Sequence, residues 1–337
     1  MRILFWGTPH YAVPTLEELH RADHQIIGVV TQPDRRRGRG KQLVPSAVKV
    51  AAEQLGCPIF TPKKIRTDAA VCSHLASLEA DLSVVVAFGQ ILPKEILQQP
   101  PFGCWNGHGS LLPRWRGAGP IQWCLLEGDS ETGVGVMAME EGLDTGPVLM
   151  ERRIKIGLLD NAQQLSDQLS KLTAQLMVEA MPIIEAAGQG PESDRLTRLN
   201  VKPQAGECSY ARLLKKEDFT IDWSASALKI HRKVMGLFPG VATFYQKKRF
   251  KILDTEPLIE RFKDQLSQDV ISLVGRWGTG THQPGQILQV IHNLGIVVST
   301  SGCPILIREG QLEGKKRSRG HSLVQQLTPQ IGEVLGA

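Results

Sequence analysis

The chain has 337 residues, of which 42% are hydrophobic and 22% charged, and its formal net charge is +5. This length and composition predict a globular protein of about two domains and exclude a disordered or fibrous chain. No uncharged apolar run approaches the roughly 20 residues that a membrane span needs, so we expect a cytoplasmic protein. The six cysteines are widely spaced and form no Cys-x-x-Cys pair, which argues against disulfides and a structural zinc site.

Short apolar runs alternate with helical patterns in the first half of the chain. We expect buried strands at 3–6, 26–30 and 82–88, with helices at 13–20, 46–55 and 68–78. This alternation predicts βαβ units and an α/β fold with a mostly parallel, doubly wound sheet. Beyond residue 130 the pattern changes to a period of two, which predicts a strand at 148–156, followed by a helix that ends at Pro182.

A segment rich in Gly, Pro and polar residues follows and is interpreted as a linker. We therefore divide the chain into a domain over 1–188, a linker over 189–206 and a second domain over 207–337. The second domain is predicted to have a helix at 224–235, with Ser224 as its N-cap candidate, and then short strands at 241–245, 250–253, 286–291, 295–300 and 305–308. Short strands with turn signals and few helices indicate a small β-barrel, in which the role of 255–285 stays open.

The charge is distributed unevenly along the chain. Residues 1–189 hold 18 basic and 20 acidic side chains, whereas residues 190–337 hold 21 and 14. The segment Asp34–Lys41 carries five basic residues in eight, and its two glycines predict a surface loop and not a helix or strand. Together the basic loop and the basic second half suggest a phosphate-rich partner such as a nucleic acid, with a merely solvated surface as the alternative.

Several catalytic motifs are missing from the sequence. No phosphate-binding glycine motif follows the first strand, and no Gly-x-Ser-x-Gly elbow is present. Nucleotide hydrolysis, a nicotinamide dehydrogenase and a serine hydrolase therefore lose support.

A polar cluster at 104–122 follows the strand at 82–88, where open α/β sheets bind their ligands. Asn106 and His108 are two residues apart, so in an extended segment their side chains share a face. Asp144 lies in a Gly- and Pro-containing loop between two expected strands, and an Asp near a His can hold it charged and aligned, as in acyl transfer. From spacing alone, a structural histidine and a turn-forming Asp are equally good interpretations.

The run Asn106-Gly-His-Gly-Ser-Leu-Leu-Pro-Arg-Trp-Arg-Gly-Ala-Gly-Pro-Ile-Gln122, followed by Gly142-Leu-Asp-Thr-Gly-Pro-Val-Leu149, resembles the folate-dependent formyltransferases. Trp6-Gly-Thr-Pro9, Thr31-Gln-Pro-Asp34 with its basic loop, and Val84-Val-Val-Ala-Phe-Gly-Gln-Ile-Leu-Pro93 are similar to the branch that formylates methionyl-tRNA. The resemblance implies a Rossmann-like formyltransferase domain and a small oligonucleotide-binding (OB) type β-barrel that binds tRNA. It also implies formyl transfer, without a metal, from 10-formyltetrahydrofolate to the α-amino group of methionine on initiator methionyl-tRNA, for translation initiation.

The resemblance also implies roles for single residues. Asn106 and His108 would donate to the formyl oxygen as it gains negative charge, and Asp144 would keep His108 cationic and relay the proton of the amine. Folate would contact Ser110, Leu111, Leu112, Pro113, Phe88, Gly89, Ile91 and Leu92. The tRNA would contact Arg35, Arg36, Arg37, Arg39, Lys41, Lys247, Lys248 and Arg249, with Arg39 and Lys41 as the strongest candidates and Lys251, Lys315, Lys316, Arg317 and Arg319 as further ones.

Gly107 departs from the family pattern, which usually has a β-branched apolar residue between the Asn and the His. The added backbone freedom would misplace His108 slightly and slow the reaction, but we expect activity to persist because both side chains and the rest of the motif are intact. Two alternatives stay open: a formyltransferase acting on a nucleotide-linked amino sugar, which needs no basic loop, and a non-catalytic RNA- or folate-binding scaffold. A phosphoribosyl-glycinamide formyltransferase would need no second domain. Nothing in the sequence requires more than a monomer.

Overall fold

The computed structural model of the protein describes residues 1–37, 40, 42–278, 280 and 282–336. The chain divides into two compact units. Unit 1 comprises Met1–Pro120, Glu131–Ile154 and Ser166–Arg212, and unit 2 comprises Ile121–Ser130, Lys155–Leu165 and Leu213–Ala337. All six cysteines are free. Within the described residues, no helix is both long enough and apolar enough to cross a membrane.

Unit 1 is built on a seven-stranded sheet with the order β10-β9-β7-β6-β1-β2-β5. Its strands are β1 (Arg2–Gly7), β2 (Gln25–Val30), β5 (Ile59–Phe60), β6 (Leu82–Val86), β7 (Cys104–His108), β9 (Glu131–Ala138) and β10 (Val148–Lys155). The pairs from β5 to β7 along this order are parallel, and β7 pairs antiparallel with β9. The prediction of a mostly parallel α/β sheet is confirmed. β6 is buried along its whole length, which explains why it is apolar except for Ser83.

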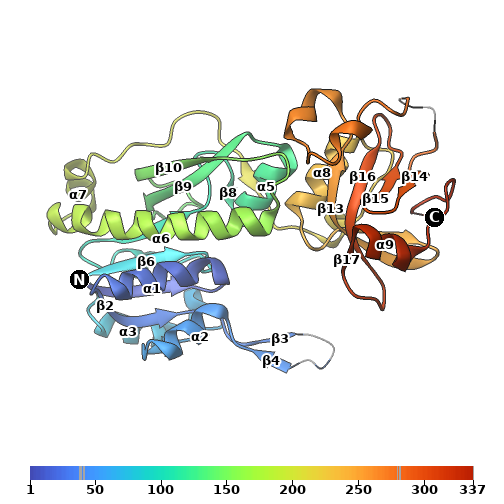
Figure 1. Cartoon of the computed structure of the whole chain (residues 1–337). Helices are drawn as coiled ribbons and strands as arrows, with labels where there is room; N and C mark the ends of the chain where they lie inside the picture. Colours follow the sequence, from blue (N-terminus) through green and yellow to red (C-terminus); the bar gives the residue numbers. More distant parts are fainter. Residues whose placement is uncertain (38–39, 41, 279, 281, 337) are drawn as a thin grey trace. The chain divides into compact units, whose positions relative to one another are not determined.

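Helices accompany these strands in chain order. They are α1 (Val13–Arg21), α2 (Ala47–Gln54), α3 (Ala69–Ser77), α4 (Lys94–Leu97), α6 (Ala162–Ala186) and α7 (Glu192–Arg198). Ser46 and Asp68 cap α2 and α3 by accepting from backbone N–H groups of the first turn. α6 lies along the sheet of unit 1 (Figure 1), and most of its length belongs to that unit.

One expectation about this part of the chain was wrong. α6 does not end at Pro182 but continues to Ala186, because the buried Met181 and Ile184 extend its apolar stripe past the proline. The predicted linker over 189–206 contains α7. Its residue Lys202 also exchanges two backbone hydrogen bonds of 2.9 Å with Val148 of β10.

The basic segment was expected to be a surface loop, but its first three arginines form a strand. Arg35–Arg37 forms β3, which pairs antiparallel with β4 (Gln42–Val44), so the two strands extend from unit 1 as a hairpin arm (Figure 1). Three consecutive arginines can lie in one strand because successive side chains point to opposite faces, which separates neighbouring positive charges. Residues Arg39 and Lys41, the strongest tRNA-contact candidates, lie outside the described residues.

Unit 2 contains a sheet with the path β12-β13-β16-β15-β14, to which β17 adds on β16. Its strands are β12 (Ala242–Tyr245), β13 (Lys248–Pro257), β14 (Ile287–Ile291), β15 (Gly295–Val298), β16 (Ile305–Leu312) and β17 (Ser318–Arg319), and its helices are α5 (Pro120–Glu127), α8 (Ala227–Gly236) and α9 (Gly320–Leu327). The five predicted strands are present, and the OB-type barrel stays a prediction. The N-cap of α8 is Ser226 and not Ser224, whose hydroxyl donates to Asp222 instead.

Candidate active site

Two of the three predicted catalytic residues, Asn106 and His108, lie on β7, next to β6 in the sheet. The two strands are parallel, so the segments that follow Val86 and His108 leave the same edge of the sheet. Asn106 and His108 point to one face of β7, as predicted, because the side chains of both reach Asp144. The Asn106 amide nitrogen lies 3.4 Å from Asp144 Oδ1, and His108 Nδ1 lies 3.8 Å from Asp144 Oδ2.

Asp144 is presented by the loop between β9 and β10, as expected from the sequence. Its backbone has a φ of +52°, a conformation that Asp tolerates better than most residues. The backbone N–H of Gly117 donates to Asp144 Oδ2 at 2.7 Å. The carboxylate is thus held by three groups, and its side chain is only 14% exposed, compared with 6% for His108. The fold therefore brings the three predicted catalytic side chains together.

His108 has a hydrogen-bond partner at one ring nitrogen and a carboxylate near the other. Its Nε2 lies 3.0 Å from the carbonyl oxygen of Trp115. Because a carbonyl oxygen only accepts hydrogen bonds, Nε2 carries a proton in this arrangement. Nδ1 faces the Asp144 carboxylate, which stabilises positive charge on the ring. The imidazole therefore lies between an acceptor and an anion, as required for a group that stabilises developing negative charge.

The predicted folate residues come from two segments, one that follows β7 and one that follows β6. Ser110 is fully buried, and its hydroxyl donates to the carbonyl of Arg114 at 2.6 Å, which closes the turn that contains Leu111, Leu112 and Pro113 directly after β7. Phe88 and Leu92 pack in the hydrophobic core. In contrast, the Ile91 side chain is 58% exposed, and Gly89 is exposed with a φ of +81°.

Sequence reasoning missed a segment that holds the catalytic loop. We call residues 204–211 the strap. Its last two residues form β11 (Tyr210–Ala211), which pairs in parallel with β8 (Arg116–Gly117). The Ser209 hydroxyl accepts from the backbone N–H of Trp115 at 3.0 Å. No local motif predicts these contacts, because the strap and the loop at 115–117 are about 90 residues apart in the sequence.

The base of the hairpin arm is tied to the end of β6. The Arg35 guanidinium donates to the side-chain oxygen of Gln32. The amide nitrogen of Gln32 in turn donates to the carbonyl oxygens of Phe88 at 3.2 Å and Gly89 at 3.0 Å. Arg35 and Arg36 are both exposed. The arm therefore emerges beside the edge of the sheet at which Asn106 and His108 lie.

The basic residues predicted in unit 2 differ in their surroundings. Lys247, Lys248 and Arg249 are exposed at the turn between β12 and β13. Phe244, which the sequence analysis missed, is 51% exposed and pairs directly with Arg249 across the two strands. An aromatic ring beside cations is typical of surfaces that bind single-stranded nucleic acid. The remaining candidates include two whose charges are already paired, since Arg317 contacts Glu309 and Arg319 contacts Asp254.

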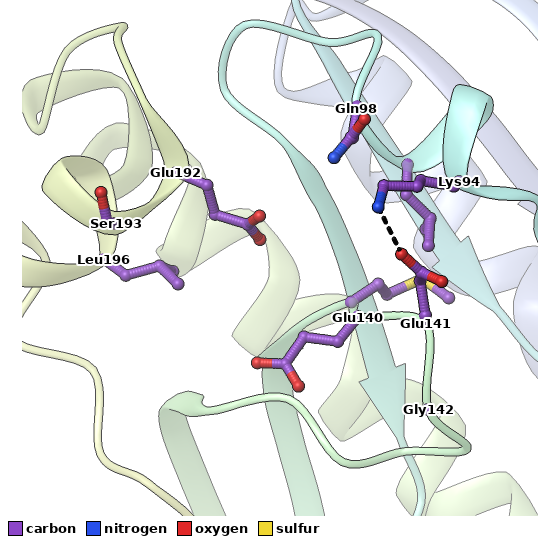
Figure 2. Close-up of a pocket in the computed structure, with 10 residues that line it drawn as sticks. Lys94, Gln98, Glu140, Glu141, Gly142, Glu192, Ser193 and Leu196 are labelled. Carbon is purple, nitrogen blue, oxygen red and sulfur yellow. Dashed lines mark ion pairs between the residues drawn. The ribbon is translucent and has the colours of Figure 1, made fainter.

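A separate cavity of about 530 Å³ opens in unit 1 (Figure 2). Glu140 and Glu141 from the loop after β9 and Glu192 from α7 surround it, and Lys94 pairs with Glu141 at 3.0 Å. Three carboxylates and one lysine make this lining acidic, so it is unsuited to phosphate groups or to the anionic tail of a folate. Among the described residues, no cluster of three His, Cys, Asp or Glu side chains is arranged to hold a metal ion.

Comparisons with known proteins match both parts of the chain. Residues 1–181 match the formyl transferase family, and residues 213–328 match the formyl transferase C-terminal domain. A methionyl-tRNA formyltransferase of Synechococcus sp. (strain WH7803) is 66% identical over 336 residues, which cover 100% of this chain and 98% of that protein. A methionyl-tRNA formyltransferase of Prochlorococcus marinus (strain MIT 9313) is 57% identical over 99% of this chain and 98% of that protein.

Solved structures resemble the fold at low sequence identity. HypX from Aquifex aeolicus, in complex with tetrahydrofolic acid, superposes with a TM-score of 0.61 at 15% identity, over 99% of this chain and 48% of that one. The sugar 3N-formyl transferase WlaRD, determined with dTDP and 5-N-formyl-THF, gives a TM-score of 0.61 at 16% identity, over 94% of this chain and 99% of that one. At these identities the two structures support the fold alone.

Proposed function

This chain belongs to the formyl transferase family, and from that membership we propose that it transfers the formyl group of 10-formyltetrahydrofolate to the α-amino group of methionine charged on initiator tRNA. One observation carries the choice of acceptor: proteins named methionyl-tRNA formyltransferase are 57–68% identical to it over nearly their whole length. The side chains that we propose act in the transfer are Asn106 and His108, which each lie close to Asp144 in one largely buried site.

The reaction forms one C–N bond and breaks another. The uncharged α-amino group attacks the formyl carbon, and the carbonyl electrons move to its oxygen. When the tetrahedral intermediate collapses, the bond to N10 of the folate breaks, N10 takes up a proton and the amine loses one. The negative charge on the formyl oxygen is the species that the site has to stabilise.

Asn106 and His108 supply donors for that oxygen. The Asn106 amide has two N–H groups, of which one is directed at Asp144 over a long 3.4 Å contact. The Nε2 proton of His108, which donates to Trp115 O, is shared with the substrate oxygen or transferred to it as charge develops. Asp144 stabilises the cationic ring through Nδ1 and relays the proton that leaves the amine.

The folate fits beside these residues. The closed turn at Ser110–Pro113 follows β7 directly, and the exposed Ile91 with the backbone of Gly89 follows the adjacent β6. An exposed apolar side chain beside exposed backbone suits a flat heterocycle with polar edges. Phe88 and Leu92 support this surface from the core. When bound, the folate supplies the activated formyl group, and these residues bind and orient it.

The hairpin arm and the β12–β13 turn suit the tRNA. Arg35 and Arg36 are exposed on an arm tied by Gln32 to the end of β6, which supports a role for them in contacting the acceptor end of the tRNA. Lys247, Lys248 and Arg249 would contact the phosphate backbone. We propose that the active form is a monomer, because all three proposed catalytic side chains come from one chain, and that it is cytosolic, because the named relatives are enzymes of methionyl-tRNA.

The test is formyl transfer from 10-formyltetrahydrofolate to methionyl initiator tRNA and methionyl elongator tRNA in parallel. Product on the initiator tRNA alone is expected. A nucleotide-linked amino sugar is assayed as the third acceptor. If the sugar is formylated and neither tRNA is, the acceptor is the sugar and not the tRNA. Folate binding without transfer to any of the three acceptors would instead support a non-catalytic scaffold.

A further inference from the structure

One side chain of the strap connects the two loops that shape the catalytic site. The amide nitrogen of Gln204 donates to the backbone carbonyl of Asp144 at 2.8 Å and to that of Gly146 at 2.8 Å. Its amide oxygen accepts from Arg116 Nε at 3.0 Å and Nη2 at 2.6 Å. Both hydrogens and the oxygen of the amide are therefore used.

The partners fix the orientation of this amide. The two carbonyl oxygens only accept hydrogen bonds, and the guanidinium only donates them. A flipped amide would place its NH₂ group against the guanidinium and its oxygen against two carbonyls. The arrangement therefore specifies glutamine chemically, because glutamate lacks the two donors and methionine lacks donors and acceptor alike.

Both loops that Gln204 joins act directly on the catalytic groups. On one side, the bond to the Asp144 carbonyl restrains a residue whose φ is +52°, away from the conformations that side chains prefer. On the other side, Arg116 lies between two contributors to the site: the carbonyl of Trp115 accepts from His108, and the N–H of Gly117 donates to the Asp144 carboxylate. Trp115 itself has a φ of +62°, so this loop too needs restraint.

We propose that Gln204 is a positioning residue for formyl transfer, which sets the placement of Asp144 relative to His108 by tethering the Asp144 loop to the Arg116 loop. It does not touch the reacting atoms. The inference rests on the proposed function, because its consequence is a change in the rate of that reaction. The strap is thus part of the catalytic apparatus, although the sequence analysis placed Gln204 in the linker over 189–206 and the rest of the strap from residue 207 in the second domain.

The experiment compares Gln204→Met and Gln204→Glu with the wild-type chain on methionyl initiator tRNA. Both variants are expected to lower kcat about 10²-fold, the loss typical of a misplacement of roughly 1 Å, with each KM within about threefold of wild type. Glutamate keeps the acceptor for Arg116 and loses the donors to the Asp144 loop. Equal losses in both variants therefore assign the effect to the tether of that loop.

Three results would overturn the inference. One is a kcat within about threefold of wild type in Gln204→Met, and another is wild-type kcat in Gln204→Glu. The third is a loss of rate fully explained by the fraction of unfolded protein in an unfolding curve at the assay temperature. If Gln204→Met does not fold, Gln204→Asn, which is one methylene too short to span both loops, is judged by the same criteria.

The controls separate this inference from the proposed function. Gln189→Ala removes an exposed glutamine side chain from the stretch between α6 and α7 and is expected to keep wild-type kcat. An inactive wild-type chain would count against the proposed function itself. An active wild-type chain with an equally active Gln204→Met variant would count against the role of Gln204 alone.

Discussion

A β-carbon on Gly107 would lie 2.5 Å from Cγ2 of Thr173, closer than β-carbons approach other atoms in real proteins. Thr173 is fully buried on α6, and its hydroxyl donates to the Leu169 carbonyl at 2.7 Å and contacts the Tyr11 hydroxyl, also at 2.7 Å. These bonds direct its methyl group at β7. The Thr173 methyl group of α6 therefore fills the space that a β-branched side chain would occupy between Asn106 and His108. This packing restrains the strand that glycine was expected to loosen.

The first prediction is that Gly107→Ala lowers the free energy of unfolding by roughly 1–3 kcal/mol, the usual cost of overpacking a core. Thr173→Ser in the same chain should restore most of this loss, because serine keeps the hydroxyl bonds and removes the methyl group that clashes. Denaturant unfolding of both single variants and the double variant measures the coupling between the two positions. Strictly additive losses would contradict the steric explanation.

Local patterns in the sequence predicted the elements that depend on neighbouring residues. The two-residue spacing of Asn106 and His108 predicted their shared face, and the almost continuously apolar run at Leu82–Val86 predicted its burial. The contacts that complete the site could not be predicted this way. Gln204 meets Asp144 across 60 residues, and only the folded chain shows that the two are adjacent. The Thr173 methyl that complements Gly107 also comes from a distant helix.

The second prediction concerns the charge on Asp144. Asp144→Asn keeps an oxygen to accept from the Gly117 N–H but removes the anion that faces His108 Nδ1. We expect kcat to fall roughly 10²–10⁴-fold, the range that general acid–base groups contribute, with little change in the KM of either substrate. Asp23→Asn is the matched control, because Asp23 is exposed and also has a positive φ, +59°. A kcat within threefold of wild type in Asp144→Asn would remove Asp144 from the mechanism.

The third prediction concerns the hairpin arm. Replacing Arg35 and Arg36 together by Ala should raise the KM for methionyl-tRNA about tenfold and leave the KM for the folate unchanged. If each arginine contacts a phosphate, the slope of log affinity against log salt should become shallower by about one unit per lost contact. The control replaces Lys63 and Lys64, two exposed lysines of the same unit, by Ala. An equal effect of both double variants would show general electrostatic attraction in place of a specific contact.

The fourth prediction concerns a buried histidine in unit 2. His231 is 1% exposed, with Nε2 2.8 Å from the Leu158 carbonyl and Nδ1 3.0 Å from the Thr255 hydroxyl. Burial lowers the pKa of His231 below its usual value near 6.5. The unfolded chain therefore takes up a proton on this residue as the pH falls below about 6.5, while the folded chain does not. The neutral ring therefore makes its whole contribution to the free energy of unfolding above about pH 6.5. This contribution is lost as the pH falls from there to the lower pKa of the folded state.

His231→Gln should therefore flatten the acid side of the stability profile. Below pH 6.5 one such group lowers the free energy of unfolding by up to about 1.4 kcal/mol per pH unit, and the glutamine variant lacks this contribution. The measurement is denaturant unfolding at pH 7, 6 and 5. Ile230→Val, which replaces the buried neighbour at a cost of about 0.5–1.5 kcal/mol, should lower stability equally at each pH and keep the wild-type slope. An unchanged slope in His231→Gln would contradict this prediction. It would mean that the folded protein binds the proton at His231 as readily as the unfolded chain does, so that burial of the neutral ring is not a source of acid sensitivity.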